Sequence, residues 1–228
     1  MNHLKVIALA ASLCTATAAF GQNLILNGGF ENQGATGYVI STGEVTNAIA
    51  EWTLQTSSSF TSYNTLVAPS GSAPNPADGA CVLNIGGFGY DKGVGNLWQD
   101  FDTSPGLTYN VRVSFGRGNN DPTPTENVSL QVSAFNISAG VPTGPALNFI
   151  DSGNAPATGA VGTLTEIGFQ FTAIGNRSRL LLDDTSVSTG PSLHLDGASV
   201  LAAVPEPSGA LLAIGSGAML LAMRGRRK

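Results

Sequence analysis

Short segments in which apolar and polar residues strictly alternate constrain the fold of this chain more than any other feature. Between residues 109 and 115 every second side chain is aromatic or valine, and polar side chains stand between them. Because successive side chains of a β-strand point to opposite faces, this pattern predicts one face in a core and one in water. Segments 127–135 and 168–172 alternate in a similar way. We therefore expect antiparallel strands.

Turn-forming residues separate these segments. The chain has 29 glycines and 12 prolines in 228 residues, and the breaks at 68–76, 116–124 and 140–145 are rich in them. Glycine and proline favour turns and weaken helices. Further strands are predicted at 23–26, 49–54, 63–67, 80–85, 97–101, 179–182 and 193–200. About ten short strands with no helical period between them predict one all-β domain, an antiparallel β-sandwich of the jelly-roll type.

The first 21 residues have the pattern of a secretory signal peptide. Lys5 supplies a positive charge, an apolar run covers 6–13, and small residues follow up to Gly21. A charged start, an apolar centre and a small-residue end are what such peptides share. We expect cleavage after Gly21, or alternatively after Ala18, which leaves residues 22–203 as the β-sandwich domain.

The segment 204–228 combines three features in a fixed order. Pro205, Glu206 and Pro207 come first, residues 208–223 carry no charged side chain, and a basic end follows. A helix over 208–223 extends about 24 Å, against about 30 Å for the hydrocarbon core of a bilayer. The pattern therefore predicts a short transmembrane helix that serves as a transient anchor.

This tail resembles the PEP-CTERM sorting signal of Gram-negative bacteria, through the Pro-Glu-Pro triplet, the apolar helix and the basic end. The resemblance implies an exosortase as a processing partner, which recognises Pro205, Glu206 and Pro207 and removes the tail. It also implies export through the inner membrane to the cell surface or the extracellular polysaccharide matrix. An ordinary C-terminal anchor behind a proline-rich spacer is the alternative.

The charge of the predicted domain disfavours nucleic acid as a partner. Five basic side chains stand against 14 acidic ones there, and phosphate contacts need a basic face. Cys81 is the one cysteine that remains after signal cleavage, so no disulfide forms within the domain. Packing or a bound ion must supply its stability. Cys81 itself is expected to be a small buried residue on a strand.

Short motifs in a characteristic order run through the domain. The opening 23–31 ends in a Phe-Glu pair, a strand around Trp52 follows, and the segments 97–101 and 195–200 form a middle and a last strand. In this order they resemble the choice-of-anchor and galactose-binding-like jelly rolls and, more distantly, carbohydrate-binding modules. The resemblance implies a binding role and the same sandwich fold.

The resemblance also implies a structural calcium ion held by Glu31 and Asp196, which match ligands of the carbohydrate-binding relatives. Calcium prefers several hard oxygen ligands, and a glycine-rich turn at 28–29 can present backbone carbonyls to it. Gly197 stands where the family more often has a second polar residue. The alternative is that both carboxylates make hydrogen bonds in turns or at a sheet edge without a metal.

Aromatic side chains on a surface are natural contacts for sugar rings, which have apolar C–H faces. Phe60, Tyr63, Phe88, Tyr90 and Trp98 are candidates, and we select Phe88, Tyr90 and Trp98 as ligand-binding residues. The first two stand in a glycine-rich segment that is predicted to be a loop. Packing at an edge of the sandwich is the alternative for each. Trp52 is predicted to belong to the core.

The sequence contains no nucleophile elbow, phosphate-binding loop or dinucleotide fingerprint. His194 is the one histidine of the mature chain, which excludes a multi-histidine zinc site, and it is expected on the outward face of a strand. Asp183 and Asp184 are adjacent, so on a strand they point to opposite faces.

We therefore predict a non-enzymatic protein that binds extracellular polysaccharide. A structural or adhesin component of the matrix with a protein partner is the alternative. A weak hydrolase ranks third, because glycoside hydrolysis needs only two carboxylates.

Overall fold

The computed structural model describes residues 21–32, 37–39, 43–56, 61–67, 76–86, 95–117, 128–152, 163–186 and 193–203. The strands are β1 (Gly37–Val39), β2 (Gly43–Ile49), β3 (Trp52–Thr56), β4 (Thr61–Val67), β5 (Cys81–Gly86), β6 (Gly95–Asp102), β7 (Thr108–Arg117), β8 (Leu130–Ser138), β9 (Val141–Pro142), β10 (Asn148–Asp151), β11 (Leu164–Thr172), β12 (Arg177–Asp184) and β13 (Leu193–Ala202). The predicted sorting tail and all of the signal peptide except Gly21 lie outside these ranges. Within them, we find no helix able to cross a bilayer.

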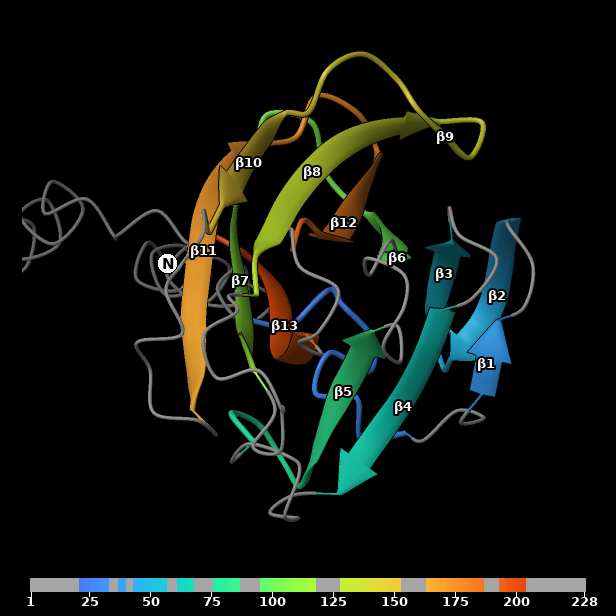
Figure 1. Ribbon diagram of the computed structural model, residues 1–228. Coiled ribbons are helices and arrows are strands. Elements are labelled where there is room, and N and C mark those ends of the chain that lie inside the picture. Colours follow the sequence, from blue (N-terminus) through green and yellow to red (C-terminus); the bar gives the residue numbers. More distant parts are fainter. Residues whose placement is uncertain are drawn as a thin grey trace, which may run out of the picture.

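Two curved antiparallel sheets make up the domain (Figure 1). The first sheet has the strand order β1-β4-β5-β13-β7-β11. The second sheet has the order β10-β8-β12-β6-β3-β2, and the short β9 pairs with β8. Strands that follow one another in sequence, such as β5 and β6, lie in different sheets, so the chain crosses repeatedly between the layers. The predicted all-β antiparallel architecture is confirmed.

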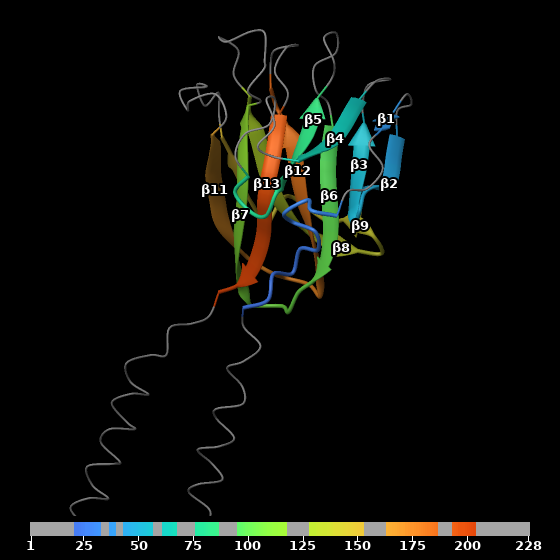
Figure 2. The same cartoon turned by 90° about the horizontal axis from the view of Figure 1, so that it is seen from below.

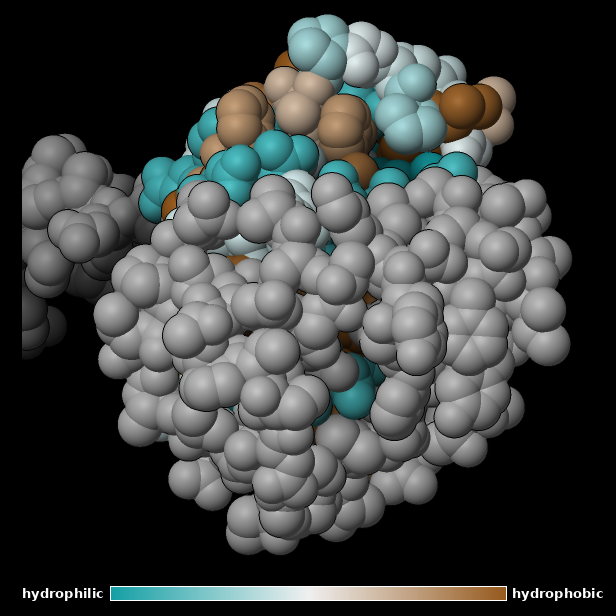
Figure 3. All heavy atoms as spheres, viewed as in Figure 1, coloured by the Kyte–Doolittle hydropathy of each residue, from teal (hydrophilic) through white to brown (hydrophobic). Residues whose placement is uncertain are grey.

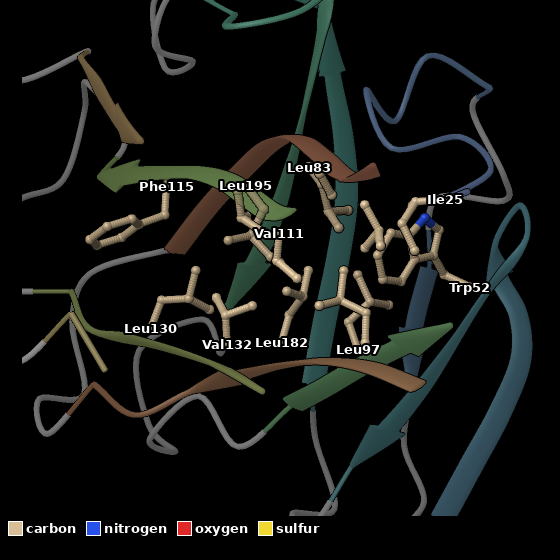
Figure 4. Close-up of a cluster of buried hydrophobic side chains, with 14 of the residues drawn as sticks. Ile25, Trp52, Leu83, Leu97, Val111, Phe115, Leu130, Val132, Leu182 and Leu195 are labelled. Carbon is tan, nitrogen blue, oxygen red and sulfur yellow. The ribbon is translucent and has the colours of Figure 1, made fainter. Parts of the chain in front are cut away.

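One hydrophobic core lies between the two sheets. In Figure 4, Leu130, Val132 and Leu182 of the second sheet point toward side chains of the first sheet. The residues that face them include Val111 and Leu195, which are at most 1% exposed. Both layers thus bury the apolar half of their alternating pattern, which is the main force that holds a sandwich together.

Trp52 occupies the predicted place in this core. It is 0% exposed, its ring centroid lies 5.5 Å from that of Phe30, and its Nε1–H donates to the carbonyl of Asn27 at 3.2 Å. A buried indole needs such a partner for its N–H group. Cys81 is buried as well, as the sequence predicts.

The segment 23–26 is not a strand, contrary to the prediction. One backbone bond, from Leu24 N–H to the carbonyl of Val200, joins it to β13. The Asn23 side chain makes the other contacts to β13: its Nδ2 donates to the Ala198 carbonyl, and its Oδ1 accepts the Val200 N–H. The register of β13 shifts between Asp196 and Ser199, and this bulge leaves groups that Asn23 can bind.

The predicted strand 49–54 is also wrong as one element, because a turn divides it. Ala50 and Glu51 connect β2 to β3, and Glu51 has a φ of 73°. The prediction missed β1, most of β2, β9 and β10. The β8–β9 connection is a two-residue turn in which Ala139 and Gly140 both have positive φ, the form that suits a tight hairpin.

The described chain enters and leaves the sandwich at the same end. Figure 2 shows the blue segment that begins at Gly21 and the red end of β13 together at the lower end of the strands. The Ala203 N–H donates to the Thr108 carbonyl, so β13 stays attached to β7 up to this point.

Candidate functional site

The outer face of the second sheet carries the side chains best suited to contact a ligand. On β12, Leu180 and Leu182 are buried in the core, whereas Leu181 and Asp183 point to the other side and are half-buried. Strands β6 and β8 alternate similarly in their central parts. Since directly paired residues of neighbouring strands share a face, the registers place side chains of five strands in rows across the sheet.

The first of these, the apolar row, crosses the sheet through Phe149, Ser133, Leu181, Trp98 and Thr53. Phe149 is 56% exposed, and Leu181 and Trp98 are half-buried. Three strand spacings separate Phe149 from Trp98, about 14 Å. A row of this length offers an apolar surface to several successive sugar rings.

The second, the polar row, lies two residues further along each strand and consists of Asp151, Gln131, Asp183, Asn96 and Gln55. Its carboxylate and amide groups can accept hydrogen bonds from hydroxyl groups, and its amides can also donate. Burial raises the pKa of Asp183 above its usual value, and the neighbouring Asp151 carboxylate raises it further. Figure 3 shows hydrophobic and hydrophilic residues side by side on the upper edge of the molecule, over β8 to β10.

Arg179 connects three elements beside these rows. Its Nε and Nη2 donate to the two carboxylate oxygens of Asp100 at 2.6 and 3.0 Å, and Nη2 also donates to the Gly140 carbonyl at 3.1 Å. Its Cζ lies 3.3 Å from the ring centroid of Trp98. The guanidinium therefore covers one face of the indole and fixes its orientation, because both a planar cation–π stack and a two-bond ion pair constrain it.

A pocket of about 400 Å³ opens beside β6, next to the place where β3 begins. Asn23 and Leu26 line one side of it, and Trp98, Asp102 and Arg177 line another. Trp98 thus borders both the apolar row and this pocket. A ligand chain that lies along the apolar row has room at this end for a further group.

Of the three predicted ligand-binding residues, the structure describes Trp98 and places it on this face. Phe88 and Tyr90 lie outside the described residues, and their predicted role is untested. Sequence reasoning missed Phe149 and Leu181. The segment 148–151 has too few residues for its alternation to be recognised, and Leu181 stands inside a run of three leucines that does not show which one faces outward.

Glu31 and Asp196 both hold the turn that precedes β5, although they come from opposite ends of the domain. Asp196 Oδ2 accepts the N–H groups of Ala77 and Asp78 at 2.5 and 2.9 Å, and Oδ1 accepts that of Gly197. Glu31 Oε1 accepts the N–H groups of Ala80 and Cys81, each at 2.7 Å. Burial raises the pKa of Asp196 to about 6, although these N–H groups lower it.

This arrangement does not fit a calcium ion as the contacts stand. N–H donors, whose partial charge repels a cation, point at both oxygens of Asp196. The described ranges contain no group of three His, Cys, Asp or Glu side chains that could hold a metal. The prediction that Glu31 and Asp196 bind calcium remains a prediction, and the backbone contacts belong to the alternative that the sequence left open.

The residues considered for catalysis do not lie together. Asp183 lies in the polar row, whereas Asp184 is buried on the inner side, as the alternation predicts. His194 follows the alternation of β13, yet it is 2% exposed rather than outward in solvent, so that expectation is wrong.

No family model and no curated protein matches this sequence. Solved structures do match. The carbohydrate-binding module TmCBM61, solved in complex with β-1,4-galactotriose, is 15% identical with a TM-score of 0.50, over 80% of this chain and all of the module. A family 16 carbohydrate-binding module is 14% identical, with a TM-score of 0.44 over 78% of this chain and 99% of that one.

An enzyme contains a similar domain. The arabinose-bound α-L-arabinofuranosidase MgGH51 is 15% identical with a TM-score of 0.48, and the match covers 82% of this chain but 27% of the enzyme. At these identities the likeness shows the fold alone. The chain has the β-sandwich fold found in carbohydrate-binding modules.

Proposed function

We propose that this domain binds a polysaccharide across the outer face of its second sheet and does not cleave it. The observation that carries the proposal is the alignment of two rows in register. Phe149, Leu181 and Trp98 supply apolar contacts, and the polar row beside them supplies acceptors and donors. A sugar ring has an apolar C–H face and a rim of hydroxyl groups, so both rows have a counterpart on it.

The fold supports this proposal, because modules such as TmCBM61 are sandwiches of the same kind. The separation of Asp183 from Asp184 supports binding rather than hydrolysis, since a glycosidase needs two carboxylates on either side of one bond. Binding modules hold their ligand by stacking and hydrogen bonds and need no such pair.

Affinity electrophoresis of residues 22–203 in gels that contain polysaccharides tests the proposal. We expect retardation by at least one polysaccharide and a tenfold or greater loss of affinity in Phe149→Ala. Ile174→Ala is the matched control, because Ile174 is 66% exposed on the β11–β12 turn, away from both rows. Equal affinity of the two variants, or no retardation by any polysaccharide, contradicts the proposal.

We further propose that the domain is exported and sorted by an exosortase. Gly21 and Ala203 leave the sandwich at one end, so both cuts fall outside the sheets (Figure 2). Mass spectrometry of the protein from the cell envelope and the medium checks this. We expect a form that lacks both the signal peptide and the tail, and retention of the tail in Glu206→Ala.

A further inference from the structure

The polar row has a charge that restricts which polysaccharide can lie on the outer face. Two of its five members, Asp151 and Asp183, are acidic, and the other three are neutral amides. They flank Gln131 on β8, so both carboxylates border the same part of the face. A carboxylate accepts hydrogen bonds from hydroxyl groups but repels another carboxylate.

No described cation of this face is available to offset that charge. Arg179 is 7% exposed and gives two hydrogen bonds to Asp100 and a third to a backbone carbonyl. Arg177 lies beyond it along β12, 3.7 Å from the carboxylate of Asp102. Recognition of a sugar carboxylate normally uses an unengaged arginine or lysine, and the described part of both rows offers none.

We propose that the outer face selects neutral polysaccharides with free hydroxyl groups and rejects chains of uronic acids, and that Asp183 determines this selectivity. Asp183 lies between Leu181, which packs against the ring face, and the hydroxyl rim that its carboxylate accepts. A uronate in that place brings a negative charge toward two existing ones. This inference rests on the proposed polysaccharide binding and narrows its ligand.

The electrostatic origin of the selectivity gives it a signature. Repulsion between charges in a partly exposed site weakens as salt increases, because the Debye length falls from about 10 Å at 0.1 M to about 3 Å at 1 M. Stacking on Phe149 and Leu181 does not weaken in that way. The preference for neutral chains must therefore decrease as salt is added.

A matched pair of ligands tests the proposal: polygalacturonate, and the same polymer after reduction of its carboxyl groups to primary alcohols. A second pair is a β-1,4-glucan and its C6-oxidised form. Affinities of residues 22–203 are measured by calorimetry in low and high salt. For at least one pair we expect wild-type protein to bind the neutral member at least tenfold more tightly, and Asp183→Asn to reduce this ratio at least threefold.

The matched control is Glu166→Gln, which removes one negative charge from the first sheet, where Glu166 pairs with Arg112 at 2.9 Å. It should leave the ratio unchanged. Equal binding of charged and neutral members, or a ratio that Asp183→Asn does not change, overturns the selectivity while polysaccharide binding stands. Binding of neither member of both pairs, and of no polysaccharide in the electrophoresis, overturns both proposals.

Discussion

Asp184 lies near the end of β12 with its carboxylate on the inner side of the second sheet. Burial raises its pKa to about 6 from an unfolded value near 3.8, although hydrogen bonds with Ser186 lower it. Because the folded pKa is the higher one, the folded state binds the proton more tightly. Asp184 therefore costs no stability below about pH 4, costs more as the pH rises through 6, and has its full effect above that.

Asp184→Asn should remove this cost. The amide keeps an oxygen that can accept the Ser186 N–H and has no charge to desolvate. We expect the free energy of unfolding at pH 7.5 to rise by up to about 3 kcal/mol, since one pKa unit corresponds to about 1.4 kcal/mol. At pH 4 the variant and the wild type should differ little. Urea unfolding at both pH values measures this, and an equal effect at both contradicts it.

Asp196 is a second residue whose role separates two explanations of stability. Its carboxylate accepts three backbone N–H groups from 77, 78 and 197, and loss of their acceptor leaves buried donors unsatisfied. We expect Asp196→Ala to lower the free energy of unfolding by about 3 kcal/mol in the presence of a chelator.

Melting temperatures with calcium and with chelator distinguish the alternatives for Asp196 and Glu31. If the N–H contacts alone stabilise the turn, Asp196→Ala has the same effect in both conditions. A wild-type melting temperature that rises with calcium, and a rise that Glu31→Ala also abolishes, would instead establish the ion. Glu166→Gln serves as the control for a change in surface charge.

The N-terminal segment and β13 approach each other closely where the bulge lies. A Cβ atom on Gly28 would stand 2.0 Å from the carbonyl oxygen of Ala198, which is backbone and cannot turn aside. The Gly28 carbonyl also accepts the Ala198 N–H at 3.0 Å. Gly28→Ala should therefore separate the two segments and cost about 3 kcal/mol, within the range of overpacked sites.

Gly29→Ala is the matched control at the next position. The nearest atom to its Cβ is Asp78 Oδ2 at 3.0 Å, the end of a side chain that can move. We expect a loss below about 1 kcal/mol there. Chemical denaturation of both variants checks the difference, and losses of equal size would contradict the close approach at Ala198.

Sequence patterns identified strands where several alternating residues occur together and failed where one residue sets the geometry. The alternation at 109–115 predicted most of β7, because hydrophobic burial follows that period directly. The turn at Glu51 could not be predicted, since a non-glycine residue adopts positive φ only when its surroundings require it. Likewise, the side chain of Asn23 replaces strand pairing in the segment 23–26, and that depends on a bulge about 175 residues away.

The candidate site shows the same limit, because it is formed by register rather than by motif. Trp98 was predicted as a contact residue from its residue type alone. Phe149 and Leu181 come next to it only through the pairing of β10, β8, β12 and β6. Pairing between strands far apart in the sequence is a property of the whole fold, so a single sequence does not reveal it.

The N-terminal segment joins the two sheets of the molecule. Asn23 binds β13 of the first sheet through its side chain. Three residues later, Leu26 exchanges hydrogen bonds with the Gln99 side chain on β6 of the second sheet, at 2.7 and 3.0 Å. Ile25 between them is buried in the core. Since these contacts involve both layers, loss of the segment should weaken both sheets rather than one.

A chain that begins at Asn27 tests this against one that begins at Asn23, which removes only residues outside these contacts. The chain from Asn27 loses a buried isoleucine and several hydrogen bonds, so we expect its free energy of unfolding to fall by about 4 kcal/mol. Amide hydrogen exchange should accelerate in β13 and in β6 together, because one segment holds both. Acceleration confined to β13 would mean that the Leu26–Gln99 contact does not stabilise the second sheet. The chain from Asn23 should exchange like the domain that begins at Gln22.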